Sequence, residues 1–98
     1  MANQYGPGPA GANVALNVSV ATVLKTVPGM VHAISVTVAG SAVGGVYDAG
    51  TTGGNVAANL IGVIPGAVTT QPLVFEWRCF TGILIVPPTG GAVSVSFV

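Results

Sequence analysis

Apolar and polar residues alternate in several short stretches of the chain, with the period of two that is typical of β-strands. In residues 13–20 the alternation predicts a half-buried strand whose core face carries the larger aliphatic side chains, Val14, Leu16, Val18 and Val20. In residues 31–39 the inward positions are expected to be His32, Ile34, Val36 and Val38. Residues 93–97 alternate Val or Phe with serine. Each stretch predicts a strand with one face on a core.

The largest side chains gather in residues 73–86, which include the only Trp and the only Cys of the chain. The period of two places Trp77 and Cys79 on one face of a strand, and Glu76, Arg78 and Phe80 on the other. On a shared face, Glu76 and Arg78 can screen each other or meet partners on a neighbouring strand. Residues 83–86 contain no polar position, which predicts a strand covered on both faces. We therefore expect these two segments at the centre of the fold.

Glycine and proline punctuate the remaining sequence and predict turns between short strands. Residues 23–27 are either a second strand or the bent continuation of the first. Residues 49–55 predict a surface loop, and residues 56–64 a strand, although a helical period also fits them. About seven strands result. The sequence thus predicts an all-β domain over residues 13–98, either a small antiparallel β-sandwich or a flattened barrel.

Residues 1–12, MANQYGPGPAGA, differ from the rest of the chain. Their glycines, together with Pro7 and Pro9, are incompatible with a regular helix or strand and predict an extended N-terminal arm. Such an arm is either disordered or docked on a neighbour. Tyr5, a large aromatic residue in this setting, favours docking.

Charge is scarce. Charged residues make up 4% of the 98 residues, the formal net charge is zero and the mean hydropathy is +0.83. Ordinary soluble domains contain roughly 25% charged residues. A monomer of this composition would present a largely apolar, nearly neutral exterior, which favours association. We therefore expect other protein, in the first place other copies of the chain, to cover much of the surface.

Several other classes of protein fit the composition poorly. No window supplies the about 20 uninterrupted apolar residues of a membrane span, so no membrane association is expected. Residues 1–12 lack the basic and apolar regions of a signal peptide, which predicts synthesis in the cytoplasm without export. Lys25 and Arg78, the only Lys and Arg residues, are too few for phosphate-driven nucleic-acid binding. One cysteine permits no intrachain disulfide.

The reactive residue types are better explained by structural roles. A triad of a serine with His32 and either Asp48 or Glu76 needs partners that nothing in the sequence places together, and no serine lies in a nucleophile elbow. Asp48 opens a Gly/Thr loop, where aspartate commonly caps a turn, and Glu76 lies beside Arg78, so a two-carboxylate glycosidase pair is disfavoured. Cys79 is expected to be buried and inert. We expect no catalytic residue, no metal site, no cofactor and no enzymatic activity.

In outline, the chain resembles the small β-sandwich proteins of tailed-bacteriophage structural gene clusters, of the capsid decoration (cement) and head-fibre type. The resemblance covers residues 13–98: a first strand after an arm, the turn after Val27, and then three segments, Val46-Tyr47-Asp48, Phe80–Val86 and Val93–Val98. The arm is longer, and the charged residues are fewer, than in that family.

The resemblance implies a virion protein on the outer surface of the capsid that forms a homo-oligomer, expected to be a trimer, and bridges major capsid protein subunits. The residues expected at its interfaces are Tyr5, Pro7, Pro9, His32, Trp77, Arg78 and Phe80. At a subunit contact, His32 would make association sensitive to pH. The alternative is a tail, fibre or receptor-binding component whose 49–55 loop contacts a host glycan. A disulfide-dependent surfactant coat protein is excluded by the single cysteine.

Overall fold

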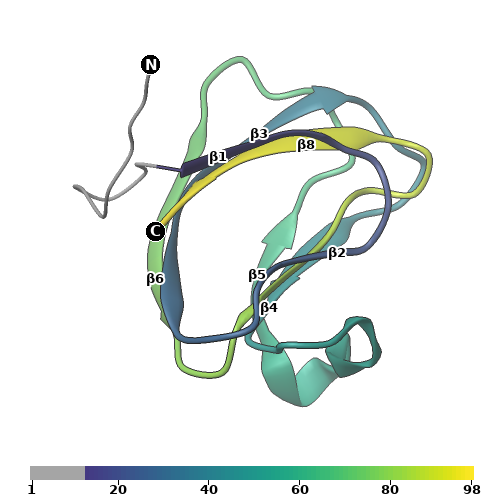
Figure 1. Cartoon of the computed structure of the whole chain (residues 1–98). Helices are drawn as coiled ribbons and strands as arrows, with labels where there is room; N and C mark the ends of the chain where they lie inside the picture. Colours follow the sequence, from purple (N-terminus) through teal and green to yellow (C-terminus); the bar gives the residue numbers. More distant parts are fainter. Residues whose placement is uncertain (1–12) are drawn as a thin grey trace.

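A computed structural model describes residues 13–98, apart from the side chain of Phe75, and arranges them in two antiparallel four-stranded sheets (Figure 1). Sheet A has the strand order β1-β8-β3-β6 and sheet B the order β2-β7-β4-β5. The strands are β1 (Asn13–Val18), β2 (Thr22–Lys25), β3 (Gly29–Val38), β4 (Gly44–Tyr47), β5 (Leu60–Ile64), β6 (Leu73–Cys79), β7 (Ile83–Val86) and β8 (Ala92–Phe97). Two short 3-10 helices, η1 (Thr52–Gly54) and η2 (Ala57–Asn59), lie between β4 and β5.

The chain passes repeatedly between the two layers. Every connection except that from β4 to β5 leads from one sheet to the other. Each sheet keeps two edge strands, so the strands do not close into a barrel. The predicted all-β class and the β-sandwich alternative are confirmed, with eight strands in place of about seven.

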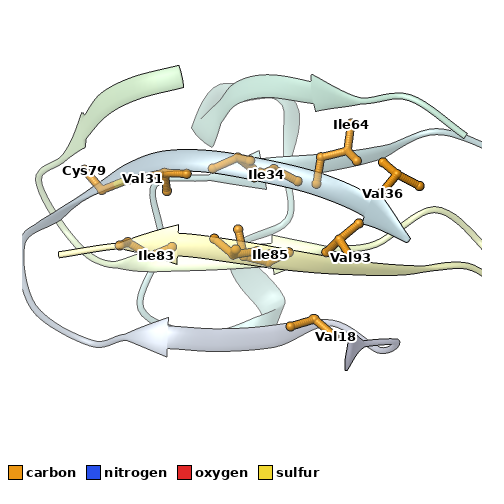
Figure 2. Close-up of a cluster of buried hydrophobic side chains, with 11 residues drawn as sticks. Val18, Val31, Ile34, Val36, Ile64, Cys79, Ile83, Ile85 and Val93 are labelled. Carbon is orange, nitrogen blue, oxygen red and sulfur yellow. The ribbon is translucent and has the colours of Figure 1, made fainter. Parts of the chain in front are cut away.

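The core lies between the sheets and consists almost entirely of Val and Ile. Figure 2 shows Val31, Ile34 and Val36 along β3, in the same cluster as Ile83, Ile85 and Val93. Ile83, Leu84 and Ile85 are fully buried, which confirms the prediction that this segment is covered on both faces. In β8, Val93 and Val95 are fully buried and Phe97 packs against the core, as the alternation predicted.

The predicted core face of the first strand was wrong except at Val18. Val14, Leu16 and Val20 are exposed, whereas Ala15 packs against the core and Val18 is buried. The pairing of β1 with β8 shifts between Ala15 and Val18, and Asn17 within this bulge has φ 55°. A bulge adds one residue and thus reverses the inward and outward positions beyond it.

The face predicted for residues 31–39 was wrong in part for the same reason. Ile34 and Val36 are buried as expected, but Val31 is also fully buried and Val38 is half exposed. The register of β3 shifts between Val31 and Ala33 against both of its neighbours. The alternation is therefore interrupted at His32, which is only partly buried.

Two segment predictions need correction. Of the predicted centre, only β7 lies inside its sheet, because β6 is an edge strand of sheet A. Residues 56–64 form a strand only from Leu60 onward, after the turn of η2. The segment 22–25 is a separate strand, β2, in the other sheet from β1.

Candidate functional site

Three loops meet at one end of the sandwich: residues 26–28 after β2, residues 48–51 after β4, and residues 80–82 after β6. A Cβ atom on Gly50 would lie 3.7 Å from the Cα atom of Thr26 and 3.9 Å from the carbonyl oxygen of Thr81. The middle loop therefore lies in van der Waals contact with both others. Glycine is required at position 82, where a Cβ atom would lie 2.5 Å from the carbonyl oxygen of Lys25 and 2.7 Å from that of Ala49. The antiparallel pair Gly29–Cys79 adds a direct link between the start of β3 and the end of β6.

Asp48 fastens the β6–β7 loop to the end of β4. Its Oδ2 atom accepts a hydrogen bond from the backbone N–H of Phe80 at 3.0 Å, and its Oδ1 atom accepts bonds from Thr81 and Gly82 at 2.7 and 3.3 Å. The predicted turn-capping role of Asp48 thus applies to a loop more than thirty residues further along the chain. Partial burial raises the pKa of this carboxyl, but the three N–H donors outweigh that effect and hold the pKa below its usual value of 3.8.

Large apolar side chains are exposed on the loop that Asp48 holds, on β6 before it, and on the loop between β2 and β3. Phe80 is 73% exposed, and Trp77 and Val27 are both more than half exposed. Trp77 pairs with Val31 and lies two residues before Cys79, and Phe80 follows directly after Cys79. We call Val27, Trp77 and Phe80 the β6 corner. Trp77 and Phe80 are thus accessible, as interface anchors must be, while the contact itself stays a prediction.

Arg78 and Glu76, which were predicted to share one face of β6, have different surroundings. Arg78 is exposed and pairs with Met30. Glu76 has φ 49°, at the register shift of β6, and its Oε1 atom lies 3.8 Å from Nδ1 of His32 on the neighbouring strand. Glu76 was expected either to be screened by Arg78 or to meet a partner on a neighbouring strand, and His32 on β3 is such a partner. This distance is too long for a hydrogen bond, and it is an ion-pair distance only when the imidazole is protonated.

Cys79 is fully buried in the core cluster, as predicted. Burial, together with the nearby negative charge of Asp48, raises the pKa of its thiol from 9.0 to about 11. The thiolate is the reactive form of cysteine. The side chain at position 79 is therefore protonated at neutral pH and packs as a small apolar group.

Among residues 13–98, no group of three or more His, Cys, Asp or Glu side chains is arranged to hold a metal ion. Within the same range, no helix is long and apolar enough to cross a lipid bilayer. Tyr5, Pro7 and Pro9, which were predicted to lie at an interface, fall outside the described residues.

Sequence reasoning missed the link between Asp48 and the β6–β7 loop. An aspartate before a Gly/Thr segment predicts a cap of its own turn. No local pattern in the sequence indicates that it accepts hydrogen bonds from the loop between two other strands. Comparison with known proteins adds no relative: no protein-family model, no curated protein and no solved structure matches the chain.

Proposed function

We propose that the chain is a non-enzymatic structural subunit of a virus particle, a capsid decoration or cement protein that forms a homo-oligomer on the outer surface of a tailed-phage head. One observation carries this proposal. In a chain with only four charged residues, large apolar side chains are exposed on both sheets and at both ends of the sandwich, including Leu16, Val63 and Phe80. Surfaces of this kind mark contacts with other protein.

The β6 corner supplies the anchor of the proposed contact. Aromatic side chains dominate the binding energy of protein interfaces when they enter a pocket on the partner. Asp48 restrains the loop that carries Phe80 through three backbone hydrogen bonds, so less conformational entropy is lost when Phe80 is buried. Trp77 adds a second ring from β6, and Arg78 between them can bind an acidic or carbonyl group of the partner.

Stabilisation of the particle then follows from mass action. Each copy buries apolar surface at about 25 cal/mol per Å2, most of which is offset by the cost of association. An oligomer with several such contacts binds the major capsid protein far more tightly than one copy does, because the later contacts form within one complex. Because the oligomer binds the assembled shell and not the dissociated subunits, its binding raises the stability of the shell.

The proposal is tested on particles assembled with and without the chain. Electron microscopy is expected to locate the protein on the outside of the head, and particles without it are expected to break at lower temperature. A location on the tail or fibre would support the receptor-binding alternative, and equal heat resistance would refute the cementing role.

A matched pair of variants tests the anchor. Phe80→Ser is expected to weaken self-association in sedimentation experiments and binding to the shell, by roughly tenfold or more if Phe80 is an interface hot spot. Val43→Ser changes an exposed apolar residue in the connection between β3 and β4, and is expected to leave both unchanged. Equal behaviour of the two variants would remove Phe80 from the interface.

A further inference from the structure

The outer face of sheet A carries a shallow hollow that no described part of the chain fills. The hollow holds about 160 Å3 and is open to solvent on one side. Its walls are formed by residues of all four strands or their ends, among them Val14, Ala33, Ser35, Pro72, Ser94 and Ser96. None of the lining residues is charged.

The strand register places this hollow on the side of sheet A that faces away from the core. Val14, Ser96, Ala33 and Val74 form one row across β1, β8, β3 and β6. The next row, which includes Ala15, Val95 and Ile34, points into the core. Val14 and Val74, at the two ends of the outer row, are 61% and 62% exposed.

The outward direction of the larger side chains on β1 indicates that this face is covered in the complete molecule. β1 turns Ala15 to the core and leaves Val14 and Leu16 in solvent. Val18 turns inward after the bulge, but before it this edge strand directs its small residue inward and its larger aliphatic residues outward, which is the wrong side for an uncovered sheet.

We propose that residues 1–12 of the same chain fold back across the outer face of sheet A and place the ring of Tyr5 in this hollow. The arm joins the sheet at Asn13, next to Val14 in the wall of the hollow. Tyr5 lies eight positions before Asn13, a length of chain that spans up to about 25 Å when extended. Four strands at a spacing of about 4.8 Å extend only about 14 Å from β1 to β6. The arm is therefore long enough, and Gly11 permits the reversal of direction.

The chemistry of the arm fits this face. Residues 1–12 carry no charged side chain, and Tyr5 is their only aromatic residue. A cavity of about 150 Å3 with aliphatic walls is known to accommodate a benzene ring. Tyrosine combines such a ring with a hydroxyl that stays in contact with polar groups, and three serines line the hollow.

Covalent connection favours the arm over a second copy as the occupant. A short linker keeps Tyr5 near the hollow at an effective concentration of the order of millimolar, and no translational entropy is lost. The contact would place Tyr5 on its own domain and not on a neighbour, where the sequence had suggested it. This inference concerns one chain alone. It leaves the exposed residues of sheet B and the β6 corner to carry the proposed function, because the arm would cover exposed residues of sheet A.

NMR spectroscopy of the full chain tests the contact. NOEs are expected between the ring protons of Tyr5 and the methyl groups of Val14 and Ala33, and Tyr5→Ser is expected to shift signals only of residues around the hollow. In a mixture of isotope-labelled and unlabelled chains, the NOEs are expected within chains. Absence of these NOEs, or NOEs between different chains, would overturn the proposal.

Two matched variants complete the test. Val14→Lys places a charge in the wall of the hollow and is expected to abolish the NOEs from Tyr5. Val63→Lys makes the same change at a similarly exposed valine of sheet B and is expected to leave them intact. Persistence of the NOEs in Val14→Lys would overturn the proposal, and Tyr5→Ser gives an independent result if Val14→Lys alters the sheet.

Discussion

Replacement of Asp48 by asparagine separates the contribution of its charge from that of its shape. The carboxylate accepts three backbone hydrogen bonds, at 3.0, 2.7 and 3.3 Å. Hydrogen bonds to a charged group contribute about 1.5–3 kcal/mol each, against about 0.5–1.5 kcal/mol for neutral ones. In Asp48→Asn the amide oxygen can still accept the bonds from Thr81 and Gly82, whereas the amide NH2 group faces the N–H of Phe80.

The expected loss in free energy of unfolding is about 2 kcal/mol, because water replaces part of what is lost at this exposed loop. For a domain of this size, such a loss lowers the melting temperature by about 10 °C. Thermal and urea unfolding at pH 7, followed by circular dichroism, measures both quantities. Glu76→Gln makes the same chemical change at the other acidic side chain, which is mostly exposed, and is expected to stay within about 0.5 kcal/mol of the unaltered protein.

The pH dependence provides the sharper test. Because the pKa of Asp48 is lower in the folded chain, its ionised form stabilises the fold above the unfolded value of 3.8, and this contribution disappears as the pH falls through the folded value. The stability difference between the unaltered protein and Asp48→Asn should therefore narrow below pH 3.8. A difference under about 0.5 kcal/mol at pH 7, or one that persists unchanged in strong acid, would refute the reasoning.

Two further predictions concern the core. The Cys79 thiol is expected to react with thiol reagents only after unfolding. The free energy of unfolding is expected to decline as the pH rises from 9.0 to about 11, because the thiol ionises at lower pH in the unfolded chain than in the folded one. Cys79→Ala should lack this decline, and an equal decline in both proteins would contradict the prediction. Ile85→Ala is expected to lower the free energy of unfolding, measured in urea, by about 2–5 kcal/mol. Val63→Ala changes an exposed position and is expected to lower it by under about 0.5 kcal/mol. Similar losses in the two variants would contradict the assigned core.

The sequence was sufficient where local pattern and tertiary structure agree. The uninterrupted apolar run of β7 and the alternation of β8 predicted their burial correctly, because the extra residue at each register shift lies in the neighbouring strand (β1, β2 or β3) and not in β7 or β8. The Gly and Pro turns were likewise sufficient for the all-β class, since turn chemistry is local.

Bulges account for most of what the sequence did not predict. The alternation of Val14, Leu16 and Val18 predicts that all three point the same way. The register shift at Asn17 instead turns Val18 inward, whereas Val14 and Leu16 point outward. Asparagine tolerates positive φ, but an asparagine in a sequence does not by itself predict a bulge. At the candidate site, the accessibility of Trp77 follows from the edge position of β6, and strand order depends on long-range pairing that no local pattern contains.

β8 lies between β1 and β3 in sheet A, although it follows every other strand along the chain. The pair Asn13–Phe97 joins opposite ends of the described chain, and such distant pairings make folding slow, on the scale of milliseconds to seconds. During translation the ribosome supplies β8 after all its partners, so the apolar side chains of β3 remain without a neighbour on that side until β8 emerges. The nascent chain is therefore most prone to aggregation just before this strand is complete.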